Sequence, residues 1–306
     1  MFPHGIRSCG GLRQMTKNNL RLGIPKGSLE DSTIKLFEKS GWKIRLHNRN
    51  YFPDIDDEDI TCSLSRAQEM AMWVENGTFD VGLTGHDWVV ENASDVVVVS
   101  DLVYSKESNK PACWVLCVAG DSTFLKPEDL EGKKIATELV NFTRNYFDSL
   151  GINVEVVFSW GATEAKVVEG LCDAIVEITE TGSTIRANGL RIIAELMKTN
   201  TQLIANRKAW EDPWKRKKIE QMNLLLQGAL RAEKTVGVKM NIPKKALGKA
   251  MELLPSITSP TVADLSDKNW ISVEVVLEEN LVRDLIPNLK SIGAEGIIEY
   301  PLNKVI

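Results

Sequence analysis

Short apolar runs alternate with amphipathic segments along most of the chain, and this alternation constrains the fold more than any other feature. The runs LRLGI (20–24) and FDVGLTG (79–85), for example, each precede a segment with helical periodicity. Parallel strands need a long crossover connection, which is usually a helix. The alternation therefore predicts a mostly parallel sheet with helices on both faces, followed by a second unit of the same kind.

Several boundaries follow from local signals. Ser28 is expected to cap the first helix, and Gly41 is expected to end it. Residues 207–233 are expected to form one long helix with a proline in its first turn.

The pattern changes after Lys234, where strand and helix signals follow in the order β-α-β-β-α-β. This order is the signature of a ferredoxin-like (ACT-like) α+β domain. Its first helix is expected to begin with Pro243, because proline is tolerated at the first helical position. Small appended domains of this shape often bind a metabolite or pair subunits, which is an analogy at the level of the fold.

These patterns predict an α/β core of two lobes, similar to a periplasmic binding protein, with a ferredoxin-like domain after it. Residues 1–18 are expected to form a disordered arm and 231–306 the C-terminal domain. Lobe I is expected at 19–110, completed by 203–230, and lobe II at 111–202. The cleft between two such lobes is a natural binding site for a small molecule.

Composition excludes several classes of protein. A net charge of −5 gives no electrostatic reason to bind nucleic acid or an anionic membrane, and no run of 18 apolar residues is present. Five cysteines without a C-x-x-C pair favour neither a disulfide framework nor a zinc site, so a reducing cytosol is expected. The three histidines show no metal-ligand spacing, so any Mg²⁺ would enter with phosphate groups.

The loop TETGST (179–184) follows the buried run CDAIVEI and is rich in hydroxyl groups. Ligands bind at the carboxyl ends of strands in open α/β sheets, and a glycine turn can present its N–H groups to an anion. Glu177 could accept hydrogen bonds from sugar hydroxyls. On these residues alone, the loop is equally well explained as a phosphate site or as an ordinary polar connection.

Two further loops end in glycine-containing turns, IPKGSL (24–29) and GLTGHD (82–87). Lys26 precedes a predicted helix N-terminus, a position that attracts anions. Arg49, Arg66 and Arg186 are the other basic residues near these loops; for Arg66 a purely structural pairing with acidic residues is the alternative. Three such loops at strand ends favour one shared site for a polyanion.

At this point the sequence resembles ATP phosphoribosyltransferase in its long form. The resemblance covers residues 19–306 and rests most strongly on DAIVEITETGSTIRANGL (173–190). It also rests on LGIPKGSL, FDVGLTGHD, LVNFTRNYF and GATE, and on VKMNIP, SPTVADL, NWISVE and GAEGIIEYPLNKVI in the C-terminal part.

The resemblance implies that N1 of the ATP adenine attacks C1 of phosphoribosyl pyrophosphate with Mg²⁺ present, releasing pyrophosphate. This is the first step of histidine biosynthesis. Positions carried over for the ribose 5-phosphate are Thr181, Gly182, Ser183 and Thr184, and those for the ribose are Asp173 and Glu177. Candidates for the pyrophosphate are Lys26, Arg66 and Arg49, and those for the shared ATP and pyrophosphate region are Thr84, Gly85 and Asp87.

The resemblance also implies that the C-terminal domain binds histidine as a feedback inhibitor. The expected contacts are Asn241, Thr261 and Gly296, at contacts between subunits, and the expected assembly is a homo-oligomer of dimers that form hexamers. Two other classes fit the residues less well: a solute-binding module, against which the phosphate-type loop and the lack of a signal peptide count, and a non-catalytic regulatory subunit.

Overall fold

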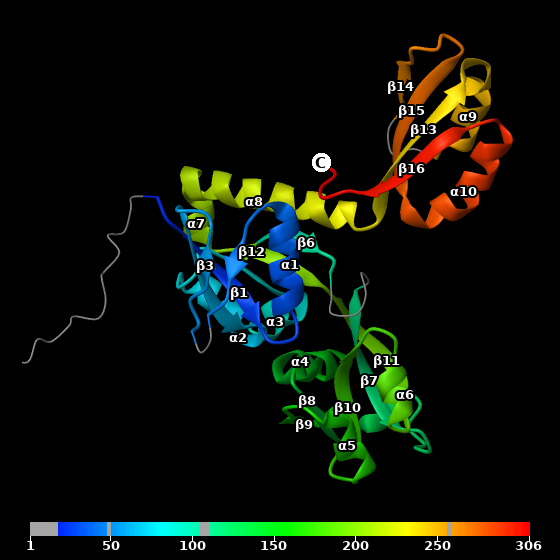
Figure 1. Cartoon of the computed structure of the whole chain (residues 1–306). Helices are drawn as coiled ribbons and strands as arrows, with labels where there is room; N and C mark the ends of the chain where they lie inside the picture. The colour runs from blue at the N-terminus through cyan, green and yellow to red at the C-terminus, as the bar shows by residue number, and fades with distance from the viewer. Residues whose placement is uncertain (1–17, 48–49, 105–110, 256–258) are drawn as a thin grey trace, which may run out of the picture.

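The computed structural model describes residues 18–47, 50–104, 111–255 and 259–306, so the predicted N-terminal arm lies almost entirely outside the described residues. Two α/β lobes and a C-terminal domain are distinct in Figure 1, and the long helix α8 (Pro213–Ala232) leads from lobe I to the C-terminal domain. No helix of the described part is both long enough and apolar enough to cross a membrane.

Lobe I is built on a five-stranded sheet in the order β4-β1-β5-β12-β6. Its strands are β1 (Leu20–Lys26), β4 (Ile60–Arg66), β5 (Val81–Gly85), β12 (Thr201–Ala205) and β6 (Val97–Leu102). Strands β4 and β5 both run parallel to β1, whereas β12 is antiparallel to both of its neighbours.

Lobe II repeats this arrangement with the strand order β11-β7-β10-β8-β9. Its strands are β11 (Leu190–Thr199), β7 (Ala112–Ala119), β10 (Ala174–Thr179), β8 (Lys134–Thr137) and β9 (Glu155–Phe158). Strands β8, β9 and β10 are parallel, and β7 is antiparallel to both neighbours.

The predictions of an α/β core and of mostly parallel sheets are confirmed, because four of the five strands in each sheet run in the same direction. The exceptions are β7 and β12. The chain passes from lobe I to lobe II before β7 and returns before β12. Each of these two strands enters the interior of its sheet in the antiparallel direction. An apolar strand carries no local signal of its direction, which explains why the two reversals were not predicted.

Helices cover the two sheets. In lobe I they are α1 (Glu30–Ser40), α2 (Ala67–Glu75), α3 (His86–Glu91), α7 (Arg207–Glu211) and α8, with a small ribbon of β2 (Ile44–Arg45) and β3 (Asp54–Ile55). In lobe II they are α4 (Val140–Leu150), α5 (Thr163–Val168), α6 (Ser183–Ala187) and a 3₁₀ turn, η1 (Pro127–Leu130). Gly41 closes α1 with a left-handed φ of 109°, as predicted, but Ser28 does not cap this helix because the helical conformation already includes Leu29.

The single helix predicted over 207–233 is broken at Asp212. The residue before a proline is disfavoured in the helical conformation, and Asp212 has an extended ψ of 118°. Its carboxylate then accepts hydrogen bonds of 2.9 Å from the amides of Trp214 and Lys215. Asp212 therefore ends α7 and caps α8.

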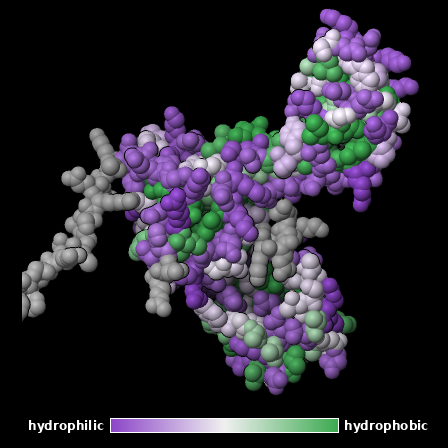
Figure 2. Space-filling model, viewed as in Figure 1, coloured by the Kyte–Doolittle hydropathy of each residue, from purple (hydrophilic) through white to green (hydrophobic). Residues whose placement is uncertain are grey.

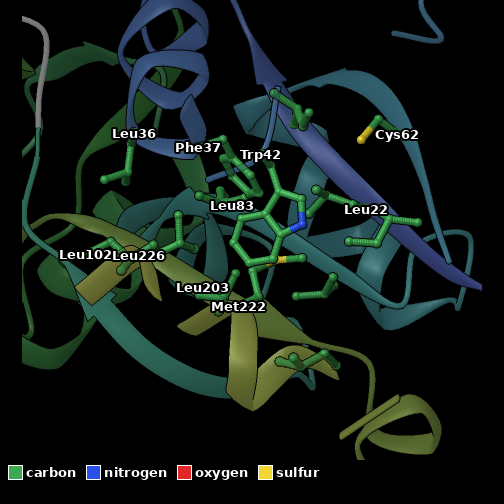
Figure 3. Close-up of a cluster of buried hydrophobic side chains, with 14 of the residues drawn as sticks. Leu22, Leu36, Phe37, Trp42, Cys62, Leu83, Leu102, Leu203, Met222 and Leu226 are labelled. Atoms are coloured by element: carbon green, nitrogen blue, oxygen red, sulfur yellow. The ribbon is translucent and has the colours of Figure 1, made fainter. Parts of the chain in front are cut away.

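The core of lobe I joins segments that are far apart in the sequence (Figure 3). Trp42 lies among Leu83 of β5, Leu203 of β12 and Met222 of α8. Phe37 of α1 is fully buried beside Trp42, with ring centroids 5.9 Å apart. Burial of each large side chain contributes about 1.5–3 kcal/mol, so the segment after lobe II is part of the stability of lobe I.

The C-terminal domain has the predicted β-α-β-β-α-β order, with an antiparallel sheet in the order β14-β15-β13-β16. Its elements are β13 (Thr235–Pro243), η2 (Lys244–Ala246), α9 (Leu247–Leu253), β14 (Thr261–Asp264), β15 (Trp270–Glu278), α10 (Glu279–Ser291) and β16 (Glu295–Pro301). The ferredoxin-like prediction is confirmed. Pro243 ends β13 and does not begin a helix, because a 3₁₀ turn comes between β13 and α9.

The last residues of the chain return to α8 (Figure 1). The amide of Val305 donates to the carbonyl of Gly228, and a Cβ at Gly228 would come within 2.9 Å of Ile306. Hydrophobic and hydrophilic residues are mixed over the face of the molecule in Figure 2, with a hydrophobic group visible on the C-terminal domain. The C-terminal domain is thus attached to lobe I at both of its ends.

A buried carboxylate stabilises lobe I at the end of the sheet opposite to the cleft. Asp80 is 2% exposed and contacts Arg21 at 2.7 Å and Lys215 at 2.9 Å. Burial alone would raise the pKa of Asp80, but hydrogen bonds from Arg21 and Lys215 outweigh it and hold this pKa below its usual value.

We expect Asp80→Asn to lower the free energy of unfolding by about 2 kcal/mol near pH 7, because two partly buried cations lose their counter-ion. The folded pKa lies below the unfolded value of about 3.9, so this difference should be complete above about pH 5 and shrink as the pH falls further. Calorimetric melting between pH 3.5 and 7 measures it.

The matched control is Asp95→Asn, which removes an exposed ion pair with Arg207 and should change stability little. Equal effects of the two variants at pH 7 would contradict the role of Asp80.

Candidate active site in the cleft

A cavity of about 650 Å³ lies between the two lobes. Lobe I contributes residues at the carboxyl ends of β1, β4 and β5, and lobe II contributes the carboxyl end of β10. Carboxyl ends of parallel strands are where α/β sheets bind ligands. Its lining includes Lys26, Gly27, Arg66, Gln68, Gly85, Asp87, Trp88, Trp114, Glu138, Trp160, Glu177 and Glu180.

Two predicted cations stand side by side on the lobe I wall. Lys26 ends β1 and Arg66 ends β4, and the two are directly paired in the parallel register. The ammonium of Lys26 lies 4.1 Å from the ring centroid of Tyr51. The guanidinium carbon of Arg66 lies 4.8 Å from the ring centroid of Trp160, which belongs to lobe II. Both cations are held by aromatic rings and border the cavity.

The GLTGHD loop places a buried carboxylate at the floor of the cleft. Asp87 is 3% exposed, and its Oδ2 accepts a 2.8 Å hydrogen bond from Nε1 of Trp114. Its other oxygen has no partner among the described residues, and burial raises the pKa of Asp87. A Cβ at Gly85 would lie 1.9 Å from Oδ1 of Asp87, so only glycine fits there.

Thr84 does not reach the cavity, although it was predicted there. Its side chain is fully buried and its hydroxyl donates to the carbonyl of Ala67 at 2.7 Å. Alternation along β5 turns Thr84 away from the residues that line the cleft.

Two glutamates from lobe II face this wall. Burial, together with the neighbouring carboxylates of Glu164 and Glu138, raises the pKa of Glu177 to about 7. Burial also raises the pKa of Glu138, whose side chain is hydrogen-bonded by Gln68 of lobe I. Near neutral pH, therefore, Glu177 exchanges readily between its charged and neutral forms.

The TETGST loop borders the cavity through Glu180, and its conformation is fixed by its own side chains. The Thr179 hydroxyl accepts from the amide of Gly182 at 2.7 Å, and the hydroxyls of Thr181 and Ser183 lie 2.9 Å apart. Gly182 has a φ of 70°, and Arg186 donates to the carbonyl of Thr181 at 3.0 Å. The hydroxyls of Thr181 and Ser183 are thus grouped at an exposed turn, which Arg186 holds in place and which Thr184 follows.

Asp173 is not part of this group, because it lies at the other end of β10. It accepts a 2.9 Å hydrogen bond from the amide of Lys134 and lies 3.8 Å from the ammonium of Lys133. Six residues along a strand span about 20 Å, which separates Asp173 from the loop. The predicted contact of Asp173 with a ribose is therefore wrong, and its role is to pair β10 with the start of β8. Arg49 lies outside the described residues.

The predicted histidine contacts are only partly brought together. Asn241 of β13 pairs with Glu295 of β16, and its amide nitrogen is 3.8 Å from the Cβ position of Gly296, where φ is 56°. Thr261 lies on β14, at the opposite edge of the sheet. Within one chain, Asn241 and Gly296 therefore lie together, whereas Thr261 lies on another strand, about 14 Å from Gly296 by strand spacing.

Several residues of the cleft were missed from the sequence, among them Gln68, Trp114, Glu138 and Trp160. Glu138 follows β8 directly, and a polar residue after a buried strand was an available signal. Trp114 lies in an apolar strand and is buried, but its indole N–H donates to Asp87. Trp160 carried no local signal, because its position depends on how the lobes close.

The described residues contain no group of three or more side chains that could hold a metal ion. Fold and cleft together define a two-lobed α/β protein that holds its ligand between the lobes, with an appended ferredoxin-like domain. Cations on one wall and a hydroxyl-rich loop near the other suit a ligand that carries phosphate groups.

Comparison with known proteins identifies the family. The model of ATP phosphoribosyltransferase matches residues 66–228, and that of the HisG C-terminal domain matches residues 232–304. The ATP phosphoribosyltransferases of Solidesulfovibrio magneticus and Nitratidesulfovibrio vulgaris (strain Miyazaki F) are 70% and 64% identical. The alignments cover 94% and 95% of this chain and 99% and 100% of theirs. The chain belongs to the ATP phosphoribosyltransferase family, the pentosyltransferases of histidine biosynthesis, in its long form.

A solved structure supports the same assignment. The ATP phosphoribosyl transferase (HisG:HisZ) complex from Thermotoga maritima is similar to 68% of this chain and to 96% of the compared chain. The TM-score is 0.59 and the sequence identity is 27%.

A side chain of lobe I caps the N-terminus of a helix in lobe II and so joins the two lobes. Helix α4 has no side-chain cap of its own, and Glu91 of lobe I accepts from the amides of Asn141 and Phe142 at 2.9 Å each. A carboxylate is well suited to the positive end of a helix. Glu91 thereby fixes how lobe II sits over the cleft.

We expect Glu91→Ala to speed hydrogen exchange at the Asn141 and Phe142 amides by about tenfold, because hydrogen bonds to a charged group contribute about 1.5–3 kcal/mol. Exchange measured by mass spectrometry or NMR tests this. The control is Glu131→Ala, which removes an exposed acceptor of the Asn153 amide within lobe II. Unchanged exchange at α4 in the Glu91 variant would show that this contact does not hold the lobes.

Proposed function

We propose that this chain transfers the phosphoribosyl group of phosphoribosyl pyrophosphate to N1 of the adenine of ATP. The bond from C1 of the ribose to N1 forms, the bond from C1 to the pyrophosphate oxygen breaks, and the adenine loses a proton. The observation that carries the proposal is one cavity lined by Lys26, Arg66 and Glu177, which the hydroxyl-rich loop meets through Glu180, in a chain of this family.

The TETGST loop holds the 5-phosphate. The hydroxyls of Thr181 and Ser183 are grouped, that of Thr184 follows them in the chain, and all three can donate to phosphate oxygens, while Gly182 allows the turn. Glu177 lines the cavity two residues before the loop. In its charged form its carboxylate accepts hydrogen bonds from the ribose hydroxyls, which orients C1 toward the adenine.

The leaving group lies against lobe I. Negative charge grows on pyrophosphate as the bond to C1 breaks, and Lys26 and Arg66, which line the cavity, stabilise that charge. Adenine N1 is a neutral nucleophile and needs no strong base. Gly85 and Asp87 border the region shared by ATP and the pyrophosphate, and the unpartnered Oδ1 of Asp87 is available to a donor there.

Mg²⁺ accompanies the pyrophosphate in this proposal. A cation held mainly by phosphate oxygens and water fits a site whose described residues form no metal-binding cluster. When bound, Mg²⁺ neutralises charge on the leaving group. Glu177 and Glu180 line the cavity and can accept hydrogen bonds from its water molecules.

In this proposal the catalytic core consists of lobe I at 19–110 with 203–230 and lobe II at 111–202. The regulatory domain at 231–306 binds histidine. Asn241 and Gly296 form one half of the histidine site, and Thr261 of another subunit completes it, because Thr261 lies on the far edge of the sheet. A site shared between subunits favours a homo-oligomer, which we expect to consist of dimers and hexamers and to be inhibited by histidine. We also expect this oligomer to be cytoplasmic.

The decisive experiment mixes the full chain with ATP, phosphoribosyl pyrophosphate and Mg²⁺ and follows the ultraviolet absorbance of phosphoribosyl-ATP, with pyrophosphatase to remove the second product. We expect product formation that histidine suppresses. No product at any enzyme concentration would refute the proposed reaction, and an unchanged rate over a long histidine titration would refute only the regulation.

We expect Thr184→Val to raise KM for phosphoribosyl pyrophosphate about tenfold with little change for ATP, because one hydrogen bond to a charged phosphate is lost. Steady-state kinetics with each substrate varied in turn give the two values. The control Thr123→Val alters an exposed threonine of lobe II that does not line the cavity. Equal loss for both substrates would contradict the assignment of the loop.

A further inference from the structure

A largely exposed tryptophan stands in the cleft, contacted only at the ring by Arg66 and Phe158 among the interactions of the described residues. Trp160 follows β9, is 63% exposed, and lines the cavity between the lobes. Leaving a large aromatic side chain in water forgoes the free energy of burying it, so its position calls for a partner that is absent from the free chain.

The backbone around Trp160 is firmly placed. The neighbouring Ser159 is buried, its amide donates to the carbonyl of Thr137 at 2.9 Å, and its hydroxyl lies 3.0 Å from that of Thr163. Gly161 and Ala162 then turn the chain with positive φ values of 67° and 47°. The Phe158 ring lies against the indole at 68°, with centroids 6.0 Å apart. The indole is therefore held in the cleft by its surroundings.

The indole is already used as a stacking surface. The guanidinium of Arg66 lies over it at 4.8 Å, reaching across from lobe I. A guanidinium and a nucleobase are both flat and polarisable, and both bind aromatic faces in this manner. The face that Arg66 covers in the free chain is thus a face suited to a base.

We propose that Trp160 is the stacking platform for the adenine ring of ATP and that Arg66 leaves this face when the base arrives. This inference rests on the proposed function and assigns the base-binding surface within its cleft. Arg66, released from the indole, remains beside Lys26 at the paired ends of β4 and β1, where the phosphates of the substrates lie. The replacement of Arg66 by adenine on the Trp160 ring therefore couples adenine binding to the position of the Arg66 guanidinium.

The test is the affinity of the full chain for ATP, measured by calorimetry without phosphoribosyl pyrophosphate. Stacking on an aromatic ring contributes enough that Trp160→Ala should weaken ATP binding about tenfold or more. Trp160→Phe retains a ring and should stay within about threefold of the parent. Leu171→Ala is the control, because Leu171 is an exposed apolar side chain of lobe II that does not line the cavity.

Steady-state kinetics separate stacking from a general effect on closure of the lobes. Trp160→Ala should raise KM for ATP while KM for phosphoribosyl pyrophosphate stays within about twofold. Unchanged ATP affinity, an equal loss for both substrates, or an equal loss in Leu171→Ala would overturn the proposal. Failure of the parent chain to form phosphoribosyl-ATP would instead refute the proposed reaction, and the ATP titration would still decide the role of Trp160.

Discussion

The chain crosses between the lobes twice, and after each crossing it adds an antiparallel strand to the interior of the sheet that it enters. Strand β7 enters lobe II between β10 and β11, and β12 enters lobe I between β5 and β6. Lobe I cannot complete its sheet without β12, which follows lobe II in the chain, whereas the five strands of lobe II are contiguous in sequence. The cleft is therefore bounded by two connections rather than one, and side chains such as Asp87 and Trp114 can form buried hydrogen bonds across it.

The cavity is unusual for a polyanion site because it contains more carboxyl groups than cations. Asp87, Glu138 and Glu177 all have raised pKa values, since burial disfavours their charged forms. Raised pKa values make these acids easier to protonate, and a protonated acid repels a phosphate group less than a charged one. A bound Mg²⁺ or a donor from the substrate favours the charged form again, so the charge of the cleft adjusts to the ligand that it holds.

Much of this fold was predictable because its signals are local. Gly41, the β-α-β-β-α-β order and the loop after β10 each depend on a few neighbouring residues. The reversed directions of β7 and β12 and the place of Trp160 were not predictable, because they depend on contacts between residues far apart in the sequence, such as Val81 with Ala205 and Arg66 with Trp160. Asp173 was misplaced for a related reason: residues close in the sequence lie at opposite ends of an extended strand.

The C-terminal domain is connected to lobe I in two places, both on helix α8. Helix α8 packs against the core of lobe I through Ile219, Met222 and Leu226 and then continues into β13. The chain returns from β16 to the same helix, where Val305 binds Gly228. Two attachments to one helix resist rotation of the C-terminal domain about either of them alone. Under the proposed function, histidine bound between C-terminal domains therefore acts on lobe I through α8, and lobe I carries Lys26 and Arg66, the residues proposed to stabilise the leaving pyrophosphate.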